Sequence, residues 1–398
     1  MKRILYLTYD GLTDALGQSQ IIPYLTRLAN EGNQISIISF EKEDLFKKHG
    51  SSIRQIVSLS KLDWHPLNYT KRPPVASTIY DIWKGYQLAK ILHGKHDFQI
   101  VHCRGYISSL IGRKLKTAFG LSMIFDMRGW WPDEKMESGY WASPVYKPVY
   151  KYFKNKERLF FTESDKVVSL TYKGKEAIVN GFFADPDRVG VIPTCVDFEI
   201  FKPRNETDRA LQRKSLGIHE NESVFVYSGS IGGNYEESTL IDVFLEYSKH
   251  HPNSYLLILS KDPVGGAVIE KLKSAGIKRF SIHNAAFREV SRFLCASDVG
   301  FIYYKLEFST IGRSPTKMGE YWASGIPVIS FKGIGDLDSI ISKYPDSGIL
   351  LSAEKSNWGK EMQQLSFAHP EKLRQYSIDY FHIQKGVQFY NSIYNELS

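Results

Sequence analysis

The amino-acid sequence predicts an α/β protein with two doubly wound domains. Short apolar runs, typical of buried parallel strands, alternate along the chain with segments whose apolar residues recur at helical spacing. This alternation occurs twice, and a segment with two prolines, residues 193–203, separates the two series. The chain has 398 residues, which fits two or three domains of about 150 residues each.

The first series opens with a strand at 4–9 (ILYLTY), a loop that contains Gly11 and Gly17, a helix that stops at Gly32, and a strand at 35–40. A strand, a glycine-containing loop, a helix and a second strand are the start of a doubly wound domain. The series continues with expected helices at 80–92 and 107–119 and expected strands at 99–103, 123–126, 166–170 and 189–192.

The second series begins with a strand at 223–227 that leads into a glycine-containing loop. We expect an N-terminal domain over residues 1–197, a C-terminal domain over 198–375, and a final helix over 376–398 that packs back on the first domain. Ligands of such sheets bind at the carboxyl ends of the strands, so the functional cleft is expected between the two domains. The further expected elements are helices at 237–250, 264–275, 289–296 and 317–324, strands at 255–259, 280–283, 299–304, 327–331 and 349–351, and a mostly helical tail at 371–397.

Composition narrows the class of protein. The three cysteines, Cys103, Cys195 and Cys295, lie too far apart for a disulfide framework or a Cys-x-x-Cys zinc site, which fits a reducing cytosol. No segment is apolar enough to span a membrane, so a soluble cytosolic protein is expected. Residues 1–200 hold 28 Lys+Arg and 21 Asp+Glu, and so carry +7 of the net charge of +8. This favours a polyanionic neighbour for the first domain, although solvated lysines on helix faces explain it equally well.

Two loops of the second domain suggest a phosphate site. The loop at 228–233 (SGSIGG) has glycines that let backbone N–H groups approach a phosphate, and its candidate residues are Ser228, Gly229, Ser230 and Gly232. A tight strand-to-helix turn is the other reading of this loop.

A later run, residues 313–329, places charged residues at the start of an expected helix. Ser314 or Thr316 caps the helix, and Lys317 and Arg313 lie where a bound phosphate would be. Glu320 follows one turn later on the side of Lys317, and a carboxylate binds the two vicinal hydroxyls of a ribose. The alternative is a capped helix with a surface Lys–Glu pair.

This run, SPTKMGEYWASGIPVI over residues 314–329, resembles the nucleotide-sugar site of the retaining glycosyltransferases of family 4, which have the GT-B fold of two Rossmann-like domains facing across a cleft. Three further segments are similar to elements of that family, and in the same order. They are DGLTDALGQSQ at 10–20, similar to the acceptor-side loop, IPTCVD at 192–197 with Phe201 and Pro203, similar to the interdomain segment, and FREV at 287–290 with ASDV at 296–299.

The resemblance implies a retaining, metal-independent sugar transfer from a nucleotide sugar, with no cofactor. It implies donor contacts from the residues named above together with Phe287 and Arg288. It implies acceptor contacts from Asp14, Gly17, Gln18 and Ser19. Two family features are absent: the first glutamate of the Glu-x₇-Glu pair is Gly312, and the segment 228–237 holds neither Arg nor Lys.

For the catalytic step, Asp126 with Arg128 stands where family members often carry a histidine or an acid, and Lys317 meets the charge of the leaving diphosphate. The alternative to a catalytic role is that Asp126 ends a strand and simply pairs with Arg128. Asp133 and Glu134 are other candidate acids, and His102 is a neighbouring histidine.

Residues 145–161 form an amphipathic segment with aromatic residues on one face. Its other face is basic. This basic face is either the solvated side of an ordinary helix or a surface that binds anionic lipid. The lipid reading suits a lipid-linked acceptor in bacterial polysaccharide assembly and a peripheral place at the inner face of the membrane. The basic residues are Lys147, Lys151, Lys154 and Arg158.

Two other functions stay open. A nucleotide-sugar epimerase or hydrolase of the same fold would need no acceptor, and a non-catalytic GT-B protein would serve as a binding partner in an assembly complex. Nucleic-acid binding is not expected, because the basic residues follow no known nucleic-acid-binding motif.

Overall fold

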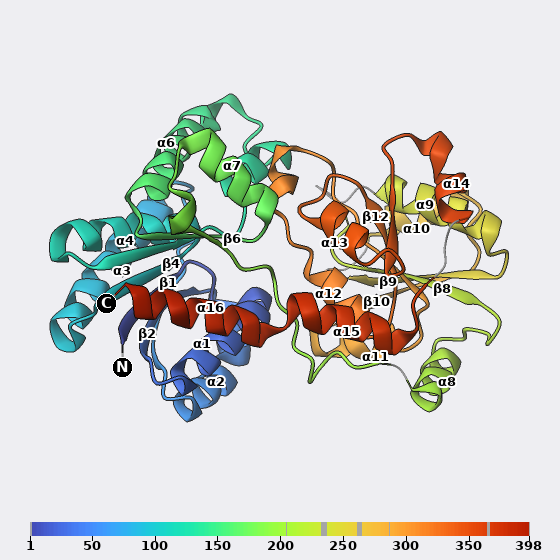
Figure 1. Ribbon diagram of the computed structural model, residues 1–398, viewed down its shortest axis with the longest axis horizontal. Helices are drawn as coiled ribbons and strands as arrows, with labels where there is room; N and C mark the ends of the chain where they lie inside the picture. The colour runs from blue at the N-terminus through green and yellow to red at the C-terminus, as the bar shows by residue number, and fades with distance from the viewer. Residues whose placement is uncertain are drawn as a thin grey trace. The chain divides into compact units, whose positions relative to one another are not determined.

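The computed structural model describes residues 2–203, 205–231, 237–260, 265–285, 287–363 and 367–397. The chain divides into two compact units, which we call unit 1 (residues 1–193 and 383–398) and unit 2 (residues 194–382) (Figure 1). Each unit is an α/β body with an all-parallel sheet, so the predicted fold class of two doubly wound domains is confirmed.

Unit 1 contains a seven-stranded sheet with the order β3-β2-β1-β4-β5-β6-β7. Its central strands have buried side chains on both faces, which explains their continuous apolar sequences. The strands are β1 (Arg3–Thr8), β2 (Gln34–Glu41), β3 (Asp63–Asn68), β4 (Ile100–Arg104), β5 (Ser122–Asp126), β6 (Lys166–Ser169) and β7 (Val189–Val191).

Helices flank this sheet, and the last helix of the chain, α16, packs against α1. The helices of unit 1 are η1 (Gly17–Ile21), α1 (Ile22–Asn30), α2 (Glu43–Leu59), α3 (Ala76–His96), α4 (Gly105–Phe119), α5 (Trp131–Glu137), η2 (Pro144–Tyr146), α6 (Lys147–Glu163), α7 (Tyr172–Phe182), η3 (Pro186–Arg188) and α16 (Ile383–Glu396).

Unit 2 contains a six-stranded sheet with the order β10-β9-β8-β11-β12-β13. Its strands are β8 (Ser223–Ser228), β9 (Ser254–Ser260), β10 (Phe280–Asn284), β11 (Val299–Phe301), β12 (Val328–Phe331) and β13 (Gly348–Leu351). Its helices are α8 (Glu206–Ser215), α9 (Glu237–His250), α10 (Gly266–Ser274), α11 (Phe287–Leu294), η4 (Phe308–Gly312), α12 (Thr316–Ala323), α13 (Leu337–Lys343), η5 (Lys355–Asn357), α14 (Trp358–Gln363) and α15 (Pro370–Phe381).

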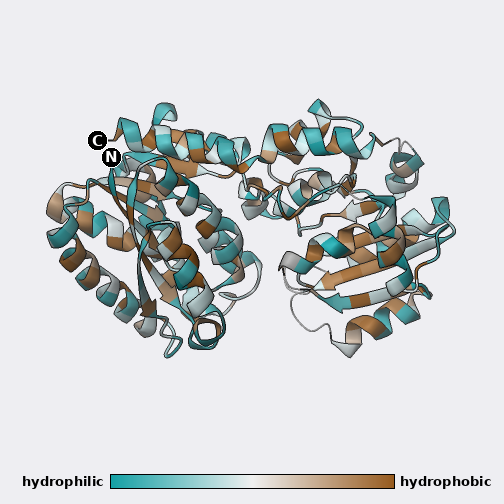
Figure 2. Ribbon diagram, turned by 90° about the horizontal axis from the view of Figure 1, so that it is seen from below, coloured by the Kyte–Doolittle hydropathy of each residue, from teal (hydrophilic) through white to brown (hydrophobic). Residues whose placement is uncertain are grey.

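In both units the apolar residues concentrate in the strands and in the inner sides of the helices (Figure 2). The two sheets therefore supply the cores, and the carboxyl ends of their strands position the loops described below. In the described part of the chain, no helix is both long and apolar enough to cross a membrane.

The unit boundaries differ from the predicted ones at 197/198 and 375/376. Thr194 binds Ser314 through backbone and side-chain hydrogen bonds, and the N–H of Val196 donates to the carbonyl of Phe381 at 3.0 Å. These contacts hold residues 194–197 in unit 2. Helix α15 packs along α12, so residues 376–382 also belong to unit 2, and only α16 joins unit 1.

Candidate functional site

At the carboxyl end of β8, Lys317 from the start of α12 lies directly against Gly229. A Cβ atom on Gly229 would be 2.4 Å from Lys317 Nζ, and the φ of +153° also favours glycine. The sequence predicts that the two segments are parts of one phosphate site. The structure brings them together at the edge where ligands of parallel sheets bind.

Tyrosine rings hold the two cations of this site. Lys317 Nζ lies 5.1 Å from the ring centroid of Tyr227 and 5.7 Å from that of Tyr304. The Arg313 guanidinium carbon lies 4.8 Å from the same Tyr304 ring. Such cation–π contacts orient a charged group without neutralising it. The tyrosine rings therefore orient both cations at the carboxyl end of β8.

Burial changes the ionisation of the predicted pair. Glu320 is 8% exposed, and burial raises its pKa to about 7 although the charge of Lys317 acts to lower it. Burial lowers the pKa of Lys317 to about 8; Glu320 opposes this shift and Arg313 adds to it. Near neutral pH, Lys317 is charged and Glu320 is about half ionised, so an anion with hydroxyl groups meets both a cation and a carboxyl acceptor.

The backbone of the glycine loop contributes less than the sequence suggested. The N–H of Ser228 donates to the Tyr321 hydroxyl at 3.0 Å, and the N–H of Gly229 donates to the carbonyl of Leu259 at 2.8 Å. Since both groups are used within unit 2, the expectation that the Gly229 amide holds a phosphate is corrected. The role of Gly229 is to leave space for Lys317.

The remaining predicted donor residues have different surroundings. The Ser230 carbonyl accepts a hydrogen bond from the Tyr227 hydroxyl, and the Phe287 ring packs 5.7 Å from that of Phe201. Gly232 and the side chain of Arg288 lie outside the described residues.

The predicted helix cap of α12 is wrong. The helix begins at Thr316, its N-cap residue is Pro315, and no side chain caps it. Ser314 Oγ instead accepts from the N–H of Thr194 at 3.1 Å, and its carbonyl accepts from Thr194 Oγ1 at 2.9 Å. Ser314 therefore fastens the start of unit 2 to the site.

In unit 1, the predicted acceptor loop is held by a buried carboxylate. Glu41 accepts from the N–H groups of Leu12 and Thr13 at 2.8 and 3.1 Å. A Cβ on Gly17 would lie 2.2 Å from the carbonyl oxygen of Gly11, so only glycine fits there.

The three polar residues predicted for the acceptor also make contacts within or beside the loop. Asp14 binds Lys42 at 2.9 Å, Gln18 Nε2 donates to the Thr13 carbonyl, and Ser19 Oγ donates to the Ala15 carbonyl. Of these three, Gln18 is exposed, while Asp14 is buried.

Asp126 lies at the end of β5 in a buried cluster of charged and aromatic groups. Its Oδ2 accepts from the Tyr390 hydroxyl of α16 at 3.0 Å, and Arg128 and Arg104 approach the carboxylate at 3.7 and 3.8 Å. His102 Nε2 lies 3.7 Å away. The cluster joins the ends of β4 and β5 to the last helix.

The ionisation of this cluster follows from its neighbours. Burial alone would raise the pKa of Asp126, but Arg128, His102 and Arg104 outweigh burial and lower the pKa to about 2. Burial lowers the pKa of His102 below its usual value. At neutral pH Asp126 is therefore a carboxylate and a poor proton acceptor, held between two arginines.

The alternative acid Asp133 is also engaged. It accepts from the Tyr150 hydroxyl and from Lys154 Nζ, both at 2.8 Å. Lys154 also pairs with Glu157 and lies over the Trp130 ring. The prediction that Lys154 belongs to an outward basic face is therefore wrong, because opposite charges draw it inward.

Sequence reasoning missed the aromatic residues that shape both sites. Tyr227 and Tyr304 each end an apolar run that predicts a strand. Such a run does not show whether its last residue belongs to the core or faces a ligand site. Tyr390 and Arg104 are far apart along the chain, so only the fold brings them to Asp126.

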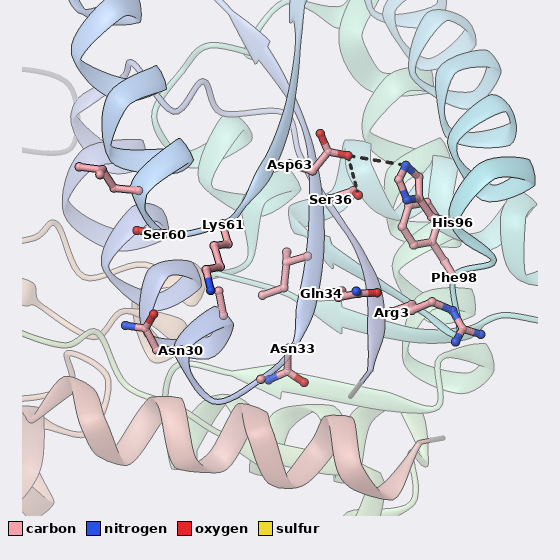
Figure 3. A pocket seen from close by; sticks show the side chains of 14 residues that line it. Arg3, Asn30, Asn33, Gln34, Ser36, Ser60, Lys61, Asp63, His96 and Phe98 are labelled. Atoms are coloured by element: carbon pink, nitrogen blue, oxygen red, sulfur yellow. Dashed lines mark hydrogen bonds and ion pairs between the residues drawn. The ribbon is translucent and has the colours of Figure 1, made fainter.

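A cavity of about 640 Å³ lies at the amino ends of the strands of unit 1, and none of the predicted site residues line it (Figure 3). Arg3, Gln34 and Asp63, the first residues of β1, β2 and β3, line it. Dashed lines in Figure 3 join Asp63 to Ser36 and to His96. The Ser36 hydroxyl donates to Asp63 Oδ2 at 3.0 Å, and His96 Nε2 lies 3.8 Å from the same oxygen. The carboxylate is thus used in local contacts.

Comparisons with known proteins agree with this architecture. The model of Glycosyltransferase Family 4 matches residues 21–200. A D-inositol 3-phosphate glycosyltransferase from Rhodococcus jostii is 26% identical over 52% of the chain and 46% of the relative. The chain thus spans about half the length of the curated relative that it matches.

Solved structures resemble the whole chain at low identity. A sucrose-phosphate synthase from Thermosynechococcus elongatus has a TM-score of 0.70 at 14% identity, covering 100% of this chain and 99% of that one. Anabaena HepE, solved with UDP and glucose, has a TM-score of 0.71 at 12% identity and full coverage of both chains. Residues 21–200 of the chain are thus similar to glycosyltransferase family 4, and the likeness to the solved structures shows the GT-B fold.

Proposed function

We propose that the chain is a glycosyltransferase that moves a sugar from a nucleotide sugar to a glycan or lipid-linked acceptor, with retention of anomeric configuration. The contact of Lys317 with Gly229, beside Glu320, carries this proposal. It combines a cation for a diphosphate with a carboxyl group for ribose hydroxyls at the carboxyl edge of a parallel sheet. The likeness to HepE, which was solved with UDP and glucose, supports a nucleotide-sugar donor.

The donor site suits departure of a nucleoside diphosphate. Negative charge builds on the diphosphate as the anomeric bond breaks, and Lys317 and Arg313 meet that charge. Their tyrosine contacts hold both cations in place before the reaction, which reduces the reorganisation that the step requires. Since two cations neutralise the charge, we propose that the transfer needs no divalent metal.

For the acceptor side, we propose that Arg128 is the catalytic group and that Asp126 positions it. Arg128 adopts a φ of +59°, an unusual backbone conformation for a non-glycine residue, and its nearest carboxylate is Asp126. With Asp126 ionised, the guanidinium keeps a fixed direction. The loop with Asp14, Gly17, Gln18 and Ser19 is proposed to contact the acceptor.

We also propose a place in bacterial surface polysaccharide assembly, with the protein in the cytoplasm and peripheral at the inner face of the membrane. The excess of positive charge in residues 1–200 supports this, because an anionic membrane or a lipid diphosphate would attract it.

A thermal-shift screen of nucleotide sugars tests the proposed function. A donor present at 100 times its Kd adds about 2.7 kcal/mol of stability, a shift that such a screen resolves. We expect stabilisation by at least one nucleotide sugar, and the same stabilisation and transfer activity in EDTA. If every nucleotide sugar leaves the melting temperature unchanged, the function is refuted; if EDTA abolishes transfer and Mg²⁺ restores it, metal independence is refuted.

A further inference from the structure

A cavity of about 650 Å³ in unit 1 has walls of unusual composition. Of the 20 residues that line it, eight are aromatic and eight are aliphatic or proline. The volume lies within the range of pockets that enclose small molecules. An apolar cavity of this size, open to solvent, calls for an apolar ligand group.

The cavity lies at the carboxyl ends of the strands of the unit 1 sheet. Tyr9 directly follows β1, Tyr69 directly follows β3, and Ile107 and Trp131 lie in the helices that follow β4 and β5. These are the carboxyl ends of the strands, where α/β sheets bind ligands. Tyr9 also adjoins the loop at 10–20, so the cavity and the proposed acceptor loop are continuous along the chain.

Packing gives the aromatic wall a fixed shape. The Trp131 ring lies 5.2 Å from that of Trp141 and 4.9 Å from that of Phe153. Toward solvent, the apolar surface continues with Ile79 and Tyr140, which are 62% and 73% exposed. Exposed apolar side chains beside an apolar cavity extend the surface available to one ligand.

The charge of the lining is one-sided. Lys71 and Lys135 line the cavity, and there is no carboxylate among the described residues that do so. A neutral hydrocarbon would bring no anionic group to these lysines. A bare glycan can stack on aromatic rings, but it would bring no apolar chain to the eight aliphatic and proline residues of the wall. Charge and apolar surface together fit an amphiphile with an anionic head.

We infer that this cavity binds the hydrocarbon chain of a lipid phosphate or diphosphate acceptor, whose head group contacts Lys71 and Lys135. The acceptor role rests on the proposed function, but the binding itself does not. The aromatic side of residues 145–161 gains a specific use, since Tyr146, Val149 and Phe153 line the cavity.

Farnesyl diphosphate, kept below its micelle concentration, is the probe, and isothermal titration calorimetry measures its Kd. We expect saturable binding to the full chain, at least about tenfold weaker binding of farnesol, and no binding of inorganic diphosphate at the same concentrations. Equal binding of inorganic diphosphate, or no binding of farnesyl diphosphate, would overturn the inference.

Two isoleucines on α3 give a matched pair of variants. Ile79→Glu puts a carboxylate on a cavity residue, whereas Ile91→Glu makes the same change at an equally exposed position, 58%, that does not line the cavity. We expect at least a tenfold rise in Kd for the first and less than a twofold change for the second. Equal effects would contradict the assignment of the site.

Nucleotide-sugar binding to the same preparation separates the two proposals. Donor binding without farnesyl diphosphate binding would remove the inference and leave the proposed function intact. Farnesyl diphosphate binding without any donor binding would refute the proposed function and leave the lipid site.

Discussion

At the residue scale, the proposed donor site contains a buried acid, Glu320, and a buried base, Lys317, and burial disfavours the charged form of each. Burial shifts the pKa of Glu320 to about 7 and that of Lys317 to about 8, so each is closer to its neutral form than in water. A diphosphate beside Lys317 favours the charged ammonium, and ribose hydroxyls donating to Glu320 favour the carboxylate. Donor binding would therefore restore both charges that folding disfavours.

Replacing Glu320 separates its cost to folding from its use in binding. Glu320→Gln should weaken donor binding about 10- to 100-fold, because hydrogen bonds to a charged acceptor contribute about 1.5–3 kcal/mol. Calorimetric titration measures this. Glu270→Gln is the control, because Glu270 also has a lysine three residues away but is 73% exposed on α10. Unchanged donor affinity in Glu320→Gln would contradict the ribose assignment.

The same variant should change how stability depends on pH. The folded protein keeps Glu320 protonated up to a pKa of about 7, whereas the unfolded chain ionises it near 4.5. Its contribution to stability is thus full below pH 4.5 and is lost as pH rises through 7. The stability of Glu320→Gln relative to wild type should rise by on the order of 3 kcal/mol between pH 4.5 and 8 in urea unfolding. A difference that is constant with pH would contradict this.

At the element scale, α16 supplies two tyrosines to the buried cluster around Asp126 in unit 1. Tyr390 donates to Asp126, and the Tyr394 hydroxyl forms a hydrogen bond with His102 Nδ1 at 2.7 Å. Both tyrosines are buried. The last helix is therefore needed for the conformation of the ends of β4 and β5, and not only for covering the sheet.

Removing one hydroxyl tests this role. Tyr390→Phe leaves the buried Asp126 carboxylate without that donor, which should cost about 1–3 kcal/mol in urea unfolding. Tyr172→Phe, at a residue that is 65% exposed on α7, should change stability by less than about 0.5 kcal/mol. A Tyr390→Phe protein as stable as wild type would show that the hydrogen bond from Tyr390 to Asp126 does not contribute to stability.

The sequence predicts buried elements better than edge elements. Runs such as ILYLTY identify the central strands because both faces are buried. Strand β3, DWHPLN, was missed, because it lies at the sheet edge where Pro66 and polar residues are tolerated. The break at His382 between α15 and α16 was missed too, since its extended ψ of 123° follows from a tertiary pairing with Val196.

For the candidate site, the sequence predicts that the segments with Gly229 and Lys317 form one site, and the structure brings them together, but the sequence does not predict how their side chains are used. Lys317 and Glu320 follow from helical spacing, which is a local property. The contact of Ser314 with Thr194 and the inward pairing of Lys154 depend on residues that are distant or engaged elsewhere. Such tertiary hydrogen bonds have no signature in a single sequence.

At the scale of the whole molecule, charge is divided between the two halves of the chain. Residues 1–200 carry +7 of the net +8. With Lys154 bound internally, Lys147, Lys151 and Arg158 remain exposed on α6. Each exposed cation near an anionic bilayer contributes about 1 kcal/mol, so three are enough to decide weak membrane association.

Liposome flotation tests this association. Wild type should float with anionic but not neutral liposomes at low salt, and should be released near 0.5 M salt because the charges are screened. The triple glutamine variant of Lys147, Lys151 and Arg158 should float less. The control carries glutamine at Lys273, Lys343 and Lys360, which are exposed in unit 2, and should float like wild type. Wild type that ignores anionic liposomes would favour a soluble acceptor.

Calorimetric titration of the most stabilising nucleotide sugar into wild type and two lysine variants tests whether Lys317 binds the donor in unit 2. Lys317→Met removes the cation beside Gly229, while Lys343→Met removes a lysine that also lies over a tyrosine ring, at 5.2 Å, but on the exposed surface of α13. We predict saturable binding to wild type, at least tenfold weaker binding to Lys317→Met, and wild-type affinity for Lys343→Met. Equal affinity in all three proteins, or no binding of any nucleotide sugar, would contradict a donor site in unit 2.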